Sequence, residues 1–183
     1  MDLFEITNGH LYPSIHALMI EPFMSMWEND TSDGKENCIR DFRFIELVCS
    51  PKKSNAYHGY SSDIRPAKVA KEVYGDENYR MTDQIMLGIM KYKEMLSHDS
   101  PTYDMYESSL RAKEKTVNYF NDFDYNERTP HGSMVVKPRD ISNALKAMPD
   151  DMKAIETMRD KVQQELLDTA KTRNSRKTGR YET

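Results

Sequence analysis

Glycine is scarce in this chain of 183 residues, which has seven glycines spread singly along it. A barrel or sandwich needs many tight turns and a phosphate-binding loop needs clustered glycines, so the composition argues against all of these. There is also no run of 18 apolar residues, which argues against a membrane span. The first residues lack the basic and then apolar order of a signal peptide. We therefore expect a mainly helical protein with no membrane segment.

Cysteine is also rare, since Cys38 and Cys49 are the only two. If both lie on one helix, their separation of 11 residues places them on the same face but roughly 16 Å apart. A disulfide needs Cα atoms within about 7 Å of each other. Two unpaired and buried thiols are typical of a protein made in a reducing compartment.

Catalytic and metal-binding patterns are absent from the sequence. The five histidines are scattered, and no serine lies in a G-x-S-x-G elbow. Asp122, Asp124 and Asn126 have the alternate spacing of a calcium loop, but Glu127 and Ser133 stand where an EF-hand has glycine and glutamate. We therefore predict no metal, no cofactor and no enzymatic activity. An acid-base enzyme without a motif stays open, because its residues can come from anywhere in the chain.

Charge is uneven along the chain. Residues 171–183 hold five basic residues and one acidic residue, a net charge of +4, which leaves −8 for the rest of a chain whose net charge is −4. We predict a flexible basic tail that could contact DNA phosphates without sequence preference, or a partner protein. A tail that only improves solubility is the alternative. The candidate contact residues are Lys171, Arg173, Arg176, Lys177, Arg180 and Tyr181.

What the chain does have is helical periodicity. We predict a single domain over residues 1–170, with about five or six helices after a short β-hairpin. Asn8-Gly9, between short apolar runs, is a strong hairpin signal. A first short helix is expected to begin at Pro22. Further helices are expected at 35–49, 66–74, 82–96, 101–121, 138–148 and 150–171. A short strand is expected at 134–136.

The longest central pattern is 101–121, which we predict to be the central helix of the domain. Its apolar residues recur at helical spacing and are Tyr103, Tyr106, Leu110, Val117 and Phe120. Ser100 is the expected N-cap, and Glu107 can pair with Arg111 four residues later.

Residues 51–65 have no apolar period and predict a long loop. Loops of this length inside a domain are often functional. Tyr57, His58 and Tyr60 are the candidate partner-contact residues, since tyrosines can be anchored while their hydroxyls stay in water.

Four segments carry a resemblance to a known family: MDLFEITNGHLYPS at the start, RPAKVAKEVYG in the middle, VVKPRDISNALK before the last helix, and the polar end from Lys177 to Glu182. In this layout the chain resembles small virion proteins of tailed bacteriophages, in particular of crAss-like and related podoviruses. The resemblance implies a non-enzymatic structural subunit, either a head-to-tail connector at the portal or a capsid-associated protein. It implies assembly in many copies with other virion proteins (portal, tail or capsid), after synthesis in the bacterial cytoplasm. A small nucleic-acid-binding or regulatory protein that uses the basic tail is the second hypothesis.

Overall fold

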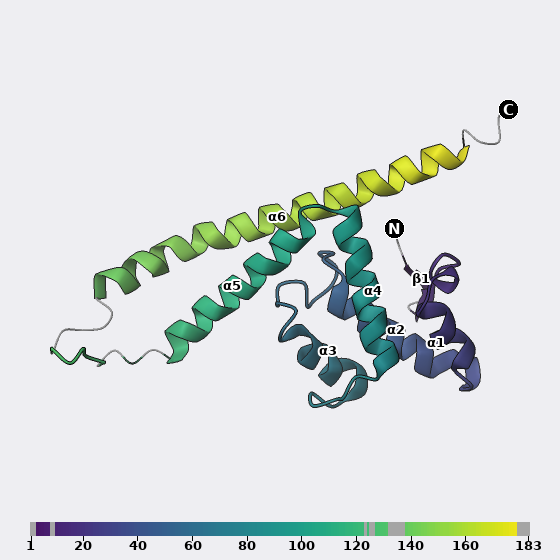
Figure 1. The fold of residues 1–183 in the computed structure, drawn as a ribbon, viewed down its shortest axis with the longest axis horizontal. Coiled ribbons are helices and arrows are strands. Elements are labelled where there is room, and N and C mark those ends of the chain that lie inside the picture. The colour runs from purple at the N-terminus through teal and green to yellow at the C-terminus, as the bar shows by residue number, and fades with distance from the viewer. Residues whose placement is uncertain (1–2, 8–9, 123, 125–126, 132–137, 179–183) are drawn as a thin grey trace.

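The structure, a computed structural model, describes residues 3–7, 10–122, 124, 127–131 and 138–178. It confirms a mainly helical chain with an N-terminal β-hairpin (Figure 1). The elements are β1 (Phe4–Thr7), β2 (His10–Pro13), η1 (Ala17–Met19), α1 (Phe23–Asn29), η2 (Asp33–Lys35), α2 (Glu36–Cys49), α3 (Arg65–Tyr74), α4 (Asp83–Asp99), α5 (Tyr103–Asp122) and α6 (Pro138–Thr178). The predicted strand at 134–136 and the turn residues 8 and 9 lie outside the described residues.

The hairpin rests on an aromatic cluster. β1 pairs antiparallel with β2, with Phe4 opposite Pro13. The Phe4 ring centroid lies 5.7 Å from that of Phe23, 5.1 Å from that of Phe42 and 6.0 Å from that of Tyr92. A two-stranded hairpin is marginal alone, so these contacts with α1, α2 and α4 stabilise it.

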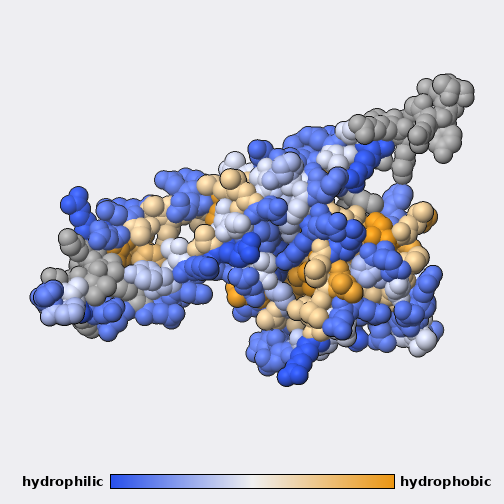
Figure 2. Space-filling view, viewed as in Figure 1, coloured by the Kyte–Doolittle hydropathy of each residue, from blue (hydrophilic) through white to orange (hydrophobic). Residues whose placement is uncertain are grey.

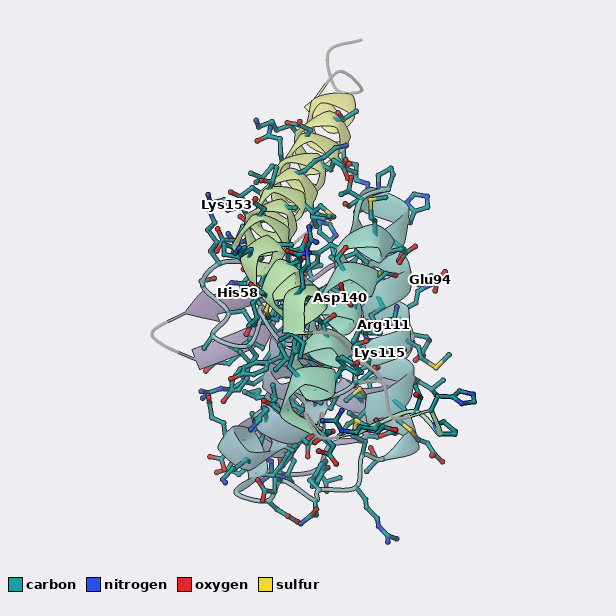
Figure 3. All side chains as sticks on the ribbon, turned by 90° about the vertical axis from the view of Figure 1, so that its left-hand side faces the viewer. His58, Glu94, Arg111, Lys115, Asp140 and Lys153 are labelled. Atoms are coloured by element: carbon teal, nitrogen blue, oxygen red, sulfur yellow. The ribbon has the colours of Figure 1, made fainter. Side chains whose placement is uncertain are left out.

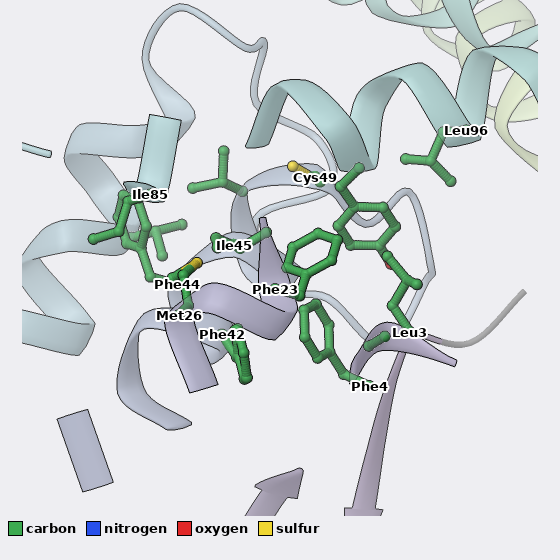
Figure 4. Packing of buried hydrophobic residues seen from close by; sticks show 14 of the residues in the cluster. Leu3, Phe4, Phe23, Met26, Phe42, Phe44, Ile45, Cys49, Ile85 and Leu96 are labelled. Atoms are coloured by element: carbon green, nitrogen blue, oxygen red, sulfur yellow. The ribbon is translucent and has the colours of Figure 1, made fainter. Parts of the chain in front are cut away.

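Helix α2 is the centre of the core (Figure 4). Its inner face is wholly buried at Phe42, Phe44, Ile45 and Val48. Cys38 and Cys49 are also buried on this helix and both are free thiols, as the spacing predicts. Removing each large side chain from water contributes about 1.5–3 kcal/mol, so this face supplies much of the folding free energy.

Helices α3 and α4 pack against α2. The end of α3 and the start of α4 are as predicted, whereas α4 continues to Asp99, three residues beyond the predicted end at Leu96. Thr82 caps α4 by accepting a hydrogen bond from the Ile85 N–H at 3.3 Å. Gly75 ends α3 in the left-handed region, at φ 75°, which favours glycine. Gly88 lets α4 approach α2 closely, because a Cβ atom there would lie 2.7 Å from the Ile45 Cδ1 atom.

Helix α6 differs from the prediction. The sequence places a helix end before Pro149 and another near Lys171, yet one helix of 41 residues runs from Pro138 to Thr178 with Pro149 inside it. Proline lacks the N–H that would bond the Leu145 carbonyl. Because this turn is exposed, water can bind that carbonyl and the helix continues.

Helix α5 is buried over only half its length. Tyr103, Tyr106 and Leu110 are almost fully buried, whereas Val117 and Phe120 are only half-buried. The second half of α5 leaves the body beside the first half of α6, and together they form a two-helix arm (Figure 1). We define the arm as residues 111–122 and 138–155. The first half of the predicted stripe is therefore buried as expected, whereas Val117 and Phe120 lie outside the buried core.

Candidate interaction site

Arg65, at the start of α3, is a fully buried charge that fixes the long loop. Its guanidinium donates hydrogen bonds to the carbonyls of Val48 and Tyr60, both at 2.9 Å, and of His58 at 3.3 Å. It also pairs with the Glu107 carboxylate on α5 at 3.2 Å. Glu107 therefore lies in the core with Arg65, and the expected surface pair of Glu107 with Arg111 is wrong.

The same loop is also hydrogen-bonded to two side chains of α5, Lys113 and Glu114. The Ser61 N–H donates to Glu114 Oε1 at 2.6 Å, and the Ser61 hydroxyl donates to the same carboxylate. The Lys113 ammonium donates to the Gly59 carbonyl at 2.9 Å. Residues 51–64 are therefore held between α3 and α5, close to the base of the arm.

His58 is a structural contact between the loop and α6. Its Nδ1 atom lies 2.7 Å from the Asn55 carbonyl oxygen, and its Nε2 atom lies 2.8 Å from Arg159 Nη1. A carbonyl can only accept, so Nδ1 carries the hydrogen and Nε2 accepts from the guanidinium. His58 is therefore engaged within the chain.

The two predicted loop tyrosines differ in their surroundings. The Tyr57 hydroxyl donates to Glu72 at 2.7 Å, and this bond raises the pKa of Tyr57. Tyr60 remains 39% exposed, although its ring lies 6.3 Å from that of Tyr57. Tyr60 is thus the predicted loop residue most open to a partner.

Glu165 joins α6 to the start of α5. Its carboxylate accepts hydrogen bonds from the Ser100 and Thr102 hydroxyls, both at 2.7 Å, and from the Thr102 N–H at 3.1 Å. Partial burial by itself raises the pKa of Glu165, but these hydrogen bonds outweigh it and lower the pKa. The Ser100 hydroxyl, expected to cap α5, binds the α6 carboxylate instead.

The basic C-terminal residues do not gather into one patch among the described side chains. Arg173 forms two bonds to the buried Asp99 carboxylate of α4, at 3.0 and 2.6 Å. Lys171 lies 3.7 Å from Asp168 on its own helix. The side chains of Arg176 and Lys177, and the residues Arg180 and Tyr181, lie outside the described part of the chain.

A groove of about 320 Å³ lies between α5 and α6 at the base of the arm. Ser109, Ala112, Lys113 and Thr116 line it on α5. On α6 the lining residues are Met148, Asp151, Met152, Ala154, Ile155 and Met158. The walls are mostly small or apolar, and Figure 2 shows pale orange surface between the charged residues of the arm. The groove can therefore accept apolar side chains of a partner.

Residues of α5 extend this groove from the body onto the arm. On α5 they follow a second stripe, which we call the outer seam: Met105, Ser109, Ala112, Thr116 and Tyr119. The spacing alternates between four and three residues, as in helices that pack along their length. Met105 is 64% exposed and Tyr119 51% exposed, so both ends of the outer seam face solvent.

A second groove, of about 760 Å³, follows α2 between the hairpin and α3. Its arginines are already engaged within the chain. Arg43 pairs with Glu72 at 2.8 Å, and the Arg40 guanidinium lies 5.3 Å from the Tyr74 ring centroid. Three glutamates and two arginines line this groove, and both arginines are engaged within the chain.

The buried titratable groups are held in their neutral or paired states. Burial raises the pKa of both Cys38 and Cys49 to about 12, which keeps these thiols protonated. Among the described residues, the Tyr103 hydroxyl and the Glu107 Oε2 atom are buried without a hydrogen-bond partner. In the same part of the chain, no three His, Cys, Asp or Glu residues are placed to hold a metal ion. No described helix combines the length and the apolar character that a membrane crossing needs.

Comparison with protein-family models, with curated proteins and with solved structures finds no match to the chain.

Several residues of the site carry no sequence signal. Arg65 and Glu107 are 42 positions apart, and nothing in the sequence indicates that they meet. Nothing in the sequence indicates either that Glu165 contacts the start of α5. The outer seam of α5, in contrast, is visible in the sequence as a second stripe beside the predicted one.

Proposed function

We propose that the protein is a non-enzymatic structural subunit of a phage particle, most simply a connector between portal and tail or a capsid-associated protein, present in several copies. The arm is the observation that supports this proposal. It projects from the body, it carries an open groove, and it exposes large apolar side chains at Tyr119 and Leu145. Met105, on α5 before the arm begins, is also exposed. A helical arm of this kind suits packing against other subunits.

The surface of the body adds to this support. Met86, Leu87 and Met90 form an exposed apolar turn on α4, with 41%, 52% and 67% of their surfaces accessible. Methionine adapts to irregular partner surfaces because it is flexible and polarizable. We choose a phage particle as the assembly because the chain resembles small virion proteins of tailed phages.

Co-expression with the portal, tail and capsid proteins of a tailed phage tests the proposal. Size-exclusion chromatography should then place the protein in complexes that hold several copies of it. A protein that always elutes apart from these components would contradict a structural role in the particle.

Nucleic-acid binding through the C-terminal basic residues is the weaker candidate. Arg173, one of the six proposed contacts, is engaged by Asp99. The net charge of −4 also repels phosphates.

A further inference from the structure

We infer that the arm is a self-association element: two copies pack groove to groove, with α5 of each copy against α6 of the other. This inference rests on the proposed multi-copy role and names the surface and the partner. It starts from the two helices that border the groove, each of which has an exposed stripe at packing spacing.

The first stripe is the outer seam of α5. Its middle residues Ser109, Ala112 and Thr116 are small, and its ends, Met105 and Tyr119, are large and more than half exposed. From Met105 to Tyr119 the seam is roughly 21 Å long. Another helix can pack along a surface of this length and cover its two apolar ends.

The second stripe lies on α6 and consists of Ala144, Ala147, Asp151, Ala154 and Met158. Its last three members line the groove, which places this stripe on the groove side of α6. Ala147 and Ala154 are exposed. Alanines allow close helix approach, so this stripe can receive the large side chains of an outer seam.

Charge selects a second copy as the occupant. Arg111 and Lys115 are exposed, and each precedes a residue of the outer seam by one position in the sequence. Figure 3 shows both side chains on α5. Asp150 and Asp151 are exposed on and beside the α6 stripe, between the exposed Lys146 and Lys153. Within the described residues, Asp150 makes one loose ion pair, 4.0 Å to Lys153. When α5 of one copy faces α6 of another, arginine and lysine meet aspartate, and a two-fold axis repeats the contact.

The expected assembly is a four-helix bundle made from two arms. A two-fold interface is isologous, so both α5–α6 contacts form together. The paired face measures roughly 21 Å by 20 Å, or about 400 Å² per copy. Stable interfaces bury about 800 Å² per partner, so we expect a dimer with a dissociation constant in the micromolar range.

Two charge-reversal variants test the pairing directly. R111E/K115E makes the border of α5 acidic, and D150K/D151K makes the border of α6 basic. Each variant alone brings like charges together at both contacts, so sedimentation velocity should show dissociation constants raised by roughly tenfold or more. An equimolar mixture should form a heterodimer, because both contacts then join opposite charges.

A pair of matched methionines tests the apolar part of the interface. Met105→Glu on the outer seam should abolish the dimer, whereas Met90→Glu on α4 should leave it intact. The two side chains are 64% and 67% exposed, so neither change disturbs the core. Circular dichroism confirms that each variant keeps its helical content.

The outcomes separate this inference from the proposed function. A wild-type chain that stays monomeric up to about 100 μM overturns the inference. A dimer that these substitutions leave unchanged also overturns it, and so does a mixture of the two charge-reversal variants that forms no heterodimer. In each of these cases the co-expression experiment can still place the protein in a particle complex. Failure of co-expression with a working arm dimer would instead overturn the proposed function.

Discussion

Arg65 shows how one side chain can hold a long segment in place. It is fully buried and satisfies three carbonyl groups and one carboxylate. A buried charge of this kind is expensive to leave partly paired.

Replacement of Arg65 by methionine should therefore destabilise the protein by about 3–5 kcal/mol, because Glu107 would remain buried without its cation. Urea unfolding measures this loss. The control is Arg43→Met, which breaks an exposed pair with Glu72 and should lower the free energy of unfolding by less than about 1 kcal/mol. Equal losses for both variants would contradict the role assigned to Arg65.

The two thiols should be inert in the folded protein. Burial raises the pKa of Cys38 and Cys49 to about 12, so the thiolate is scarce at neutral pH. We expect iodoacetamide to modify neither cysteine in native buffer and both in urea, as read by mass spectrometry. Rapid labelling of the native protein would show that α2 opens.

At the scale of the helix, α5 divides into a buried half and a projecting half. Leu110→Ala should lower the free energy of unfolding by about 2–5 kcal/mol, because Leu110 is 1% exposed and its loss leaves a cavity. Phe120→Ala removes a larger side chain but should have the smaller effect, because Phe120 is half exposed on the arm. Chemical denaturation of both variants checks the order, and the reverse order would place the end of α5 in the core.

Sequence reasoning succeeds for elements whose signals are local. The hairpin follows from Asn8-Gly9, the start of α4 from Thr82 and the end of α3 from Gly75. It fails at α6, where Pro149 and the basic end both suggest breaks. The helix continues because its middle is docked through Val162, which is fully buried, and through Glu165. Such contacts depend on residues more than 60 positions away, so no local pattern contains them.

The contact between α6 and the start of α5 should be acid-sensitive. The lowered pKa of Glu165 means that its contribution to stability is complete above the ordinary glutamate pKa and is lost as pH falls through the folded value. The Glu165→Gln variant lacks this titration. We therefore expect the difference in Tm between the wild type and E165Q to be constant above about pH 5 and to shrink as the pH falls below that value. A difference that stays constant below about pH 5 as well would show that Glu165 does not titrate in this range.

At the scale of the whole molecule, the two candidate functions predict different responses to DNA. For a structural subunit with net charge −4, we expect no binding to double-stranded DNA at physiological salt in fluorescence anisotropy. The alternative predicts binding that weakens with salt and a salt slope that falls by about two in R176Q/K177Q. This variant keeps the Arg173–Asp99 pair, so it is a cleaner probe than removal of the whole C-terminal segment.

The length of α6 has a mechanical consequence. At about 1.5 Å per residue its 41 residues span roughly 60 Å, and Val162 fixes the rod to the body between its two ends. Arg159, Glu165 and Arg173 also hold the rod, to the loop, to the start of α5 and to α4, on both sides of Val162. A force that bends the arm is therefore resisted along this whole docked segment of α6 and not at a single point.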